Sequence, residues 1–232
     1  INTEEDAYAA GSTIGAYLRG LGFTLDFAPD ADVLTNPQNT AIGDRSFGED
    51  AERVLRCASA YSDGLHAQGI LSTFKHFPGH GATEADTHDG FAYTDLTYEE
   101  LRQADLIPFA GAREAGADCV MVSHIAVPNI TGDNTPCSLS YQMITEVLRE
   151  DLGYDGIIVT DAMNMGAVVS QYASGEAAVA AVRAGADVIL MPQNLQSAAE
   201  GVLAAVRSGV ISEERIDASV RRLIRVKLKM KR

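Results

Sequence analysis

The chain has 232 residues, 46% of them hydrophobic, and a formal net charge of −14. This length and apolar content suffice for one domain with a full core. A surface this acidic repels phosphate backbones, so we expect no nucleic-acid partner. No apolar run approaches the length of a membrane span. The three cysteines lack the spacing of a redox pair or a zinc site, which slightly favours a cytoplasmic location. If an export signal preceded Ile1 and has been removed, the protein is instead secreted or cell-wall-associated.

Helix-like segments alternate with short apolar runs along the chain. In chain order we predict a helix at Glu4–Arg19, a strand at Phe23–Ala28, a helix at Glu49–Ala67, a strand at Ile70–Phe74, a helix from Thr97 to about Glu114, a strand at Cys119–Val122, a helix at Ser140–Asp151, a strand at Ile157–Thr160, a helix at Gly175–Ala184, a strand at Val188–Met191, and helices at Leu195–Ser208 and Ser212–Lys229. Continuous apolar runs are typical of strands buried on both faces. Their alternation with helices predicts an α/β fold with a parallel sheet.

Polar residues close several of the apolar runs, and this pattern bears on the architecture. Lys75-His76, Ser123-His124 and Asp161 are examples. Parallel α/β folds place their chemistry at the carboxyl ends of strands. Because the polar residues follow at least four runs, and no glycine-rich nucleotide loop opens a helix, we favour a (β/α)8 barrel over an open doubly wound sheet. A barrel needs eight strands and about five are visible, so two or three lie before Ile1 or escape prediction.

The segment 75–88 concentrates titratable residues in a loop. Pro78 and the neighbouring glycines exclude a helix there. Asp86 stands two residues before His88, so in extended backbone its carboxylate can bond the imidazole and raise the basicity of the ring. Such a pair serves as a general acid/base. The alternative is a solvated turn.

Two further residues are candidates for chemistry. Asp161 follows the apolar run 157–160, so it is either a nucleophile or base on a rigid strand end, or a helix N-cap. Arg45 lies on a glycine-flanked loop, where it can clamp hydroxyls or carboxylates, or pair with Asp44, Glu49 or Asp50.

A metal site is the third possibility for this part of the chain, with His76, His80, Asp86 and His88 as potential ligands. The spacing from His76 to His80 crosses Pro78-Gly79, so it is not the helical histidine pair of a zinc hydrolase. Lys75 beside the site would also oppose a cation. We therefore predict no metal and no cofactor.

Several of these motifs together resemble glycoside hydrolase family 3, in its β-N-acetylglucosaminidase (β-hexosaminidase) branch. They are K-H-F-P-G-H-G at 75–81, the Asp86-x-His88 pair, T-D-A-M at 160–163, F-A-P at 27–29 with Asp32-Val33, Asn36-Pro37, and I-G-x-R-S-F at 42–47. The resemblance covers most of the chain, from about Gly20 to the final helix.

The resemblance implies a retaining double displacement on a (β/α)8 barrel. Asp161 would be the nucleophile, His88 the acid/base and Asp86 its orienting partner. The residues assigned to substrate binding are Arg45, Lys75, His76, Asp32, His124 and Met163. The family's first two strands, which carry a further sugar-binding Asp and Arg, would precede Ile1. Residues 1–232 are then expected to form a single, partial catalytic barrel domain with no C-terminal sandwich domain.

We therefore expect an exo-acting retaining β-N-acetylglucosaminidase that removes terminal N-acetylglucosamine from cell-wall or chitin-type oligosaccharides. Three alternatives stay open. A neutral histidine does not repel phosphate as a carboxylate would, so phosphate could replace water in a phosphorolytic reaction. Because strands are missing, the chain could instead be an incomplete barrel that binds sugar without turnover. The histidine-rich loop leaves a metal hydrolase as the third alternative.

Overall fold

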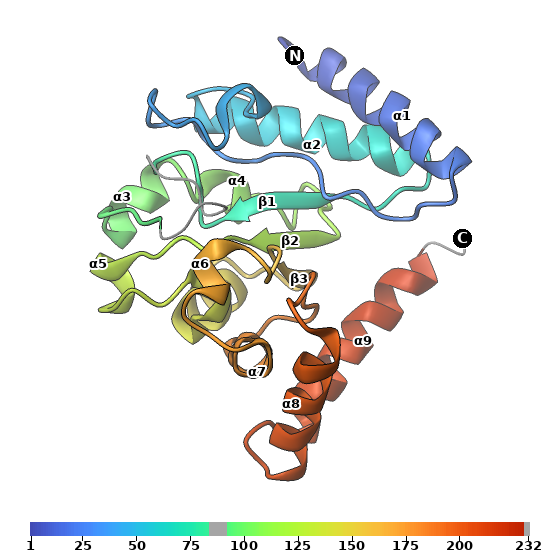
Figure 1. The fold of residues 1–232 in the computed structure, drawn as a ribbon. Coiled ribbons are helices and arrows are strands. Elements are labelled where there is room, and N and C mark those ends of the chain that lie inside the picture. The colour runs from blue at the N-terminus through green and yellow to red at the C-terminus, as the bar shows by residue number, and fades with distance from the viewer. Residues whose placement is uncertain (84–91, 230–232) are drawn as a thin grey trace.

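The structure is a computed structural model that describes residues 1–83 and 92–229. The pair predicted at Asp86 and His88 lies outside the described residues. In chain order the elements are α1 (Glu4–Gly20), the 3-10 helix η1 (Gly43–Arg45), α2 (Ala51–Ala67), β1 (Thr73–Phe77), α3 (Tyr98–Gln103), α4 (Ile107–Ala110), β2 (Cys119–Val122), α5 (Pro128–Thr131), the 3-10 helix η2 (Cys137–Leu139), the π-helix η3 (Gln142–Asp151), β3 (Ile157–Thr160), α6 (Gly166–Val169), α7 (Ser174–Ala184), α8 (Leu195–Arg207) and α9 (Glu213–Lys229) (Figure 1).

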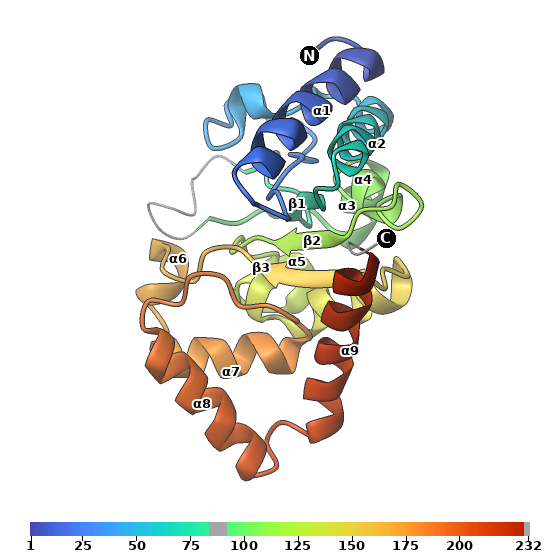
Figure 2. The ribbon, with the colours of Figure 1, turned by 90° about the vertical axis from the view of Figure 1, so that its right-hand side faces the viewer.

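A parallel sheet forms the centre of the described structure. Its strands follow chain order, β1-β2-β3, with Thr73 opposite Cys119 and Cys119 opposite Ile157. Figure 2 shows the three strands side by side, with α1 and α2 beyond β1, and α7 and α8 beyond β3. The parallel sheet expected from the alternation of helices and apolar runs is therefore present.

Two predicted strands are extended segments at the edges of this sheet rather than full strands. The segment 24–31 runs beside β1, with parallel bridges from Leu25 to Leu71 and from Asp30 to Lys75. At the other edge, Val188 forms a parallel bridge to Val159. Each edge segment is paired with one described neighbour only, and proline interrupts the first at position 29. Isolated bridges replace a continuous ladder because proline has no amide hydrogen to donate.

The two faces of the sheet are buried in different ways. On one face, Val120 and Ile158 belong to a large apolar cluster with side chains of α2, α4, η3 and α7. On the other face, Met121 and Val159 pack with the edge segments and with Val226 of α9. Side chains alternate between the faces along each strand, so both sides of the predicted apolar runs are covered.

The helix predicted from Thr97 to about Glu114 is wrong in its second half. Its start is confirmed, because Thr97 and Glu100 form the expected capping box. α3 ends at Gln103, however, and a separate short helix, α4, begins at Ile107 with Pro108 in its first turn. Proline interrupts a helix because it lacks an amide hydrogen and its ring clashes with the carbonyl four residues earlier.

α1 and α2 pack unusually closely through glycine. A Cβ atom added to Gly64 of α2 would lie 2.3 Å from the Tyr8 carbonyl oxygen and 2.6 Å from the Ser12 nitrogen in α1. A Cβ on Gly11 would lie 2.1 Å from the Tyr61 carbonyl oxygen. Only glycine permits two backbones to approach so closely. This contact sets the position of both helices beside β1.

The basic C-terminal stretch forms a helix that is tied to the sheet. Arg222 of α9 lies 3.0 Å from Asp187, whose carboxylate is also paired with Arg149 and Arg215. The Asp187 side chain is fully buried. Among the described helices, none combines the length and apolar content needed to cross a membrane. The three cysteines are free and buried.

Candidate active site

The candidate site lies at the carboxyl ends of the three strands. His76 is part of β1, His124 follows β2 by two residues, and Asp161 directly follows β3. These residues are far apart in the sequence, but the parallel sheet brings the ends of neighbouring strands to one edge. A bulge between Lys75 and Phe77 in the pairing of β1 with β2 breaks the regular alternation at His76.

Asp32 forms the buried polar centre of the site. Its Oδ2 accepts hydrogen bonds from the His76 ring Nδ1, at 2.7 Å, and from the His76 backbone amide, at 3.2 Å. Its Oδ1 accepts the His80 amide at 2.6 Å. The Asp32 side chain is completely buried. Asp32 therefore orients the start of the loop as well as the His76 ring.

The protonation of this pair follows from its surroundings. Burial opposes ionisation of Asp32, but the charge and hydrogen bond of His76, then the charge and amide of His80, outweigh it and lower the pKa of Asp32 to about 2. Burial likewise opposes charge on His76, but Asp32, Asp30 and Asp161 raise the pKa of the ring. The pair is therefore a carboxylate with an imidazole whose protonated form is favoured.

Asp30 is a site residue that sequence reasoning missed. It is 8% exposed; its Oδ1 accepts the Asp32 amide at 3.1 Å, and its Oδ2 lies 3.8 Å from the Arg45 Nη1. Among the described residues, that Oδ2 has no hydrogen-bond donor. Burial and the charge of Asp32 raise the pKa of Asp30 to about 7, against the opposing charges of His76 and Arg45. The available signal was its position two residues before Asp32 at a strand end, where side chains can share a face.

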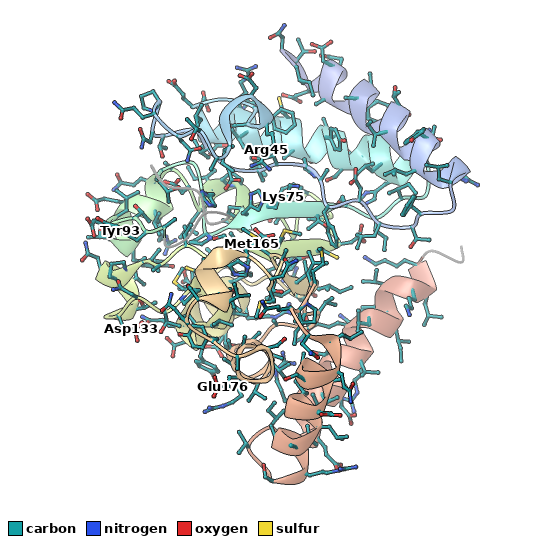
Figure 3. All side chains as sticks on the ribbon, in the orientation of Figure 1. Arg45, Lys75, Tyr93, Asp133, Met165 and Glu176 are labelled. Carbon is teal, nitrogen blue, oxygen red and sulfur yellow. The ribbon has the colours of Figure 1, made fainter. Side chains whose placement is uncertain are left out.

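Arg45 and Lys75, both labelled in Figure 3, bring positive charge to this part of the molecule. Arg45 pairs with Asp30, not with the sequence neighbours considered as its partners, and its side chain is 48% exposed. Lys75 is half-buried and lies opposite Met121 in the sheet, so it faces the side that the edge segments and α9 cover. The exposed Arg45 guanidinium is accessible to an anionic or hydroxyl-rich ligand.

The backbone of Asp161 is held by a hydrogen bond, and only one of its two carboxylate oxygens accepts a hydrogen bond from a described residue. Its amide donates to the Val122 carbonyl at 2.8 Å, and its Oδ1 accepts the Ala162 amide at 2.7 Å. Within the described part of the chain, no hydrogen bond or ion pair to its Oδ2 occurs. The residue is half-buried; its charge contributes to the raised pKa of His76 and opposes the lowering of the His124 pKa by burial. A carboxylate with one held and one available oxygen can act as a nucleophile or a base.

Two residues predicted to bind substrate, His124 and Met163, are buried beneath Asp161 and its neighbours. His124 is fully buried; its Nδ1 is 2.7 Å from the Ser138 Oγ and its Nε2 is 3.0 Å from the Ala162 carbonyl oxygen. Met163 is 3% exposed and packs in the large apolar cluster. Their direct contact with substrate stays a prediction.

The described part of the loop after β1 is firmly attached to the segment 32–42. Asn39 donates from its side chain to the carbonyls of His80, at 2.8 Å, and Thr83, at 2.7 Å. A Cβ on Gly81 would lie 1.9 Å from the Val33 carbonyl oxygen, so glycine is required for close packing. This attachment holds the turn at 78–81 against the segment 32–42.

Three ionisable groups of the site could together hold a metal ion. One ligand atom each from Asp30, Asp32 and His76 lies within 4.8 Å of the others. Both oxygens of Asp32 already accept hydrogen bonds, however, and Arg45 faces Asp30. A cation would have to displace these interactions, so we assign no metal role to the group.

Comparison with known proteins identifies the family of the chain. Residues 1–226 match the model described as "Glycosyl hydrolase family 3 N terminal domain". The chain is 34% identical over 247 residues to "Beta-hexosaminidase A" of Pseudoalteromonas piscicida, and the match covers 97% of this chain and 41% of that protein.

Two solved structures are also similar. A glycoside hydrolase family 3 β-N-acetylglucosaminidase from Paenibacillus sp. FPU-7 has a TM-score of 0.96 and 42% identity, covering 99% of this chain and 44% of that one. The β-glucoside phosphorylase BglX, bound to 2FGlc, has a TM-score of 0.94 and 28% identity, covering 99% and 43%. The chain thus spans less than half the length of these relatives. The match to the family model along nearly the whole chain shows that it belongs to glycosyl hydrolase family 3.

Proposed function

We propose that this chain carries the catalytic residues of a retaining exo-β-N-acetylglucosaminidase that releases terminal N-acetylglucosamine from cell-wall or chitin-type oligosaccharides. The observation that carries the proposal is the geometry of Asp161. Its Oδ1 is held by the Ala162 amide, while no described group engages its Oδ2. That oxygen is available to attack the anomeric carbon and form a glycosyl-aspartate.

His88 would act as the acid/base, tuned by Asp86, and would first protonate the leaving oxygen and then activate water. Both residues lie outside the described part of the chain, so their roles rest on the resemblance of the motifs. Arg45, Lys75 and His76 would bind sugar hydroxyls. Asp32 would hold the His76 ring in place, since it accepts both hydrogen bonds from that residue.

We further propose that the sheet belongs to a (β/α)8 barrel. The strands follow chain order, and an extended segment lies parallel to each edge strand. Many helical elements, α2, α4, η3 and α7 among them, contribute to the large apolar cluster on one face, and on the other face α9 is the only described helix in the apolar cluster. A barrel has its helices on the outside and strands on the inside, whereas a doubly wound sheet has helices on both faces.

The test uses the full-length protein and a 4-nitrophenyl N-acetyl-β-glucosaminide. We expect Asp161→Ala to lower kcat by at least about a thousandfold, because the nucleophile is lost. Azide should restore release of nitrophenol and yield the α-glycosyl azide, since a small anion can take the place of the carboxylate. The exposed Asp63→Ala is the matched control. Unchanged hydrolysis by Asp161→Ala would refute the proposal.

A phosphorolytic reaction is the second candidate, favoured by the similarity to BglX. Product analysis with and without phosphate separates the two reactions. Formation of a sugar 1-phosphate as the main product in phosphate buffer would establish phosphorolysis, and release of free sugar alone would exclude it.

A further inference from the structure

The tautomer of His124 can be assigned from its two partners. A carbonyl oxygen only accepts hydrogen bonds, so the Nε2 facing the Ala162 carbonyl at 3.0 Å must carry the hydrogen. Nδ1 then accepts a hydrogen bond from the Ser138 hydroxyl at 2.7 Å. Both ring nitrogens are therefore used by the protein, and the residue is fully buried. No ring nitrogen of His124 is left for a sugar.

The environment also keeps this ring neutral. Burial lowers the pKa of His124, and the charges of His76 and His80 act in the same direction, while Asp161 and the Ala162 carbonyl oppose them. A neutral ring donates one hydrogen bond in a fixed direction. Such an arrangement suits a residue that holds a neighbouring group in position.

The group it holds is the turn that carries Asp161. The Asp161 amide donates to the carbonyl of Val122 in β2, at 2.8 Å, and the Met163 amide donates to the Leu190 carbonyl, at 2.9 Å. Between them, the Ala162 carbonyl faces the His124 Nε2 and also accepts the Met165 amide at 3.1 Å, so His124 supplies the one side-chain donor described at this carbonyl. The Ala162 amide, which bonds the Asp161 Oδ1, therefore lies between backbone contacts on both sides.

We propose that His124 is a positioning residue that aims the Asp161 carboxylate by fixing the Ala162 carbonyl. The inference rests on the proposed function, in which Asp161 attacks the sugar. A rigidly held carboxylate reacts faster because it already points at the anomeric carbon and need not reorient before attack. A misplacement of about 1 Å lowers the rate on the order of a hundredfold. Since His124 makes no sugar contact in this assignment, its loss should lower kcat and leave KM nearly unchanged.

A matched pair of substitutions in the full-length protein tests this role. The amide nitrogen of glutamine reaches about as far as Nε2, so His124→Gln can keep the donor to Ala162, whereas the shorter His124→Asn cannot. With the nitrophenyl substrate, we expect His124→Asn to lower kcat roughly 30- to 100-fold with KM within about twofold. His124→Gln should recover most of kcat. Equal, wild-type kcat in both variants, or a raised KM at constant kcat, would overturn the inference.

Two further variants, Asp161→Ala and Ser138→Ala, separate failure of the proposed function from failure of the positioning role. If Asp161→Ala remains active, the proposed function itself fails; if Asp161→Ala is inactive while His124→Asn is unaffected, only the positioning role fails. Should His124→Asn not fold, as judged by thermal unfolding, Ser138→Ala decides. Loss of the Ser138 hydroxyl removes the donor to Nδ1, so a lower kcat at constant KM supports the role and a wild-type kcat overturns it.

Discussion

Replacing Asp32 with asparagine removes the buried charge on which His76 and His80 depend. The carboxylate accepts three hydrogen bonds, from the His76 ring, the His76 amide and the His80 amide. Asparagine keeps one acceptor oxygen and turns an NH2 group toward at least one of these donors. At least one buried N–H is then left without a partner: the His80 amide if the asparagine oxygen faces His76, or both His76 donors if it faces the His80 amide.

The size of the effect follows from the pKa of Asp32. Its fall from 3.8 to about 2 corresponds to about 2 kcal/mol of the free energy of unfolding. An unpaired buried donor adds about 1–3 kcal/mol. Part of this is offset, because the charge of Asp32 contributes to the raised pKa of Asp30. We therefore expect a net loss of about 3 kcal/mol, or a fall in Tm of roughly 6–12 °C for a domain of this size.

Urea unfolding of Asp32→Asn, wild type and the exposed control Asp63→Asn at pH 6 measures this loss. Because the pKa of Asp32 is lowered, its stabilising contribution is complete above about pH 4 and disappears as pH falls through about 2. The difference in the free energy of unfolding between Asp32→Asn and wild type should therefore begin to shrink below about pH 4. A loss below about 1 kcal/mol, or one equal to that of Asp63→Asn, would refute the reasoning.

Two other predictions concern stability. Burial, then the charge of Asp32, raises the pKa of Asp105 to about 7, so its stabilising contribution is lost as pH rises through that value. The loss begins near the ordinary aspartate value of 3.8, so wild type should decline relative to Asp105→Asn by about 1–3 kcal/mol between pH 5 and pH 8 in urea unfolding; an equal decline of both proteins with pH would contradict this. Gly64→Ala should lose about 1–3 kcal/mol, because its Cβ would meet the Tyr8 backbone, whereas Gly20→Ala, with nothing within 4 Å, should be nearly neutral. Equal Tm values would show that α1 and α2 do not pack this closely.

The candidate site could be predicted only in part. Lys75-His76, His124 and Asp161 were singled out because each follows or ends an apolar run, and the structure places them in or just after the three neighbouring strands. Asp30 was missed as a site residue, although its position two residues before Asp32 at a strand end was an available signal. For its partner, Arg45, the sequence suggested Asp44, Glu49 or Asp50 as alternatives to a ligand, and the structure pairs Arg45 with Asp30.

Local patterns in the sequence locate the central strands and most helices, and they single out the motifs that we propose to carry chemistry. These features depend on periodic burial and on capping residues, which are local properties of the chain. The helix break between α3 and α4 also had a local signal, which was Pro108 itself. The amphipathic pattern of the surrounding residues concealed that signal. The family resemblance rested on the same short motifs.

Only the tertiary structure decided how the polar residues are partnered. Asp32 bonds His76 and His80 across more than 40 residues, and His124 reaches both Ser138 and the Ala162 carbonyl. A charged or polar side chain has many possible partners in a sequence, and the choice among them depends on which elements pack together and which groups burial deprives of water.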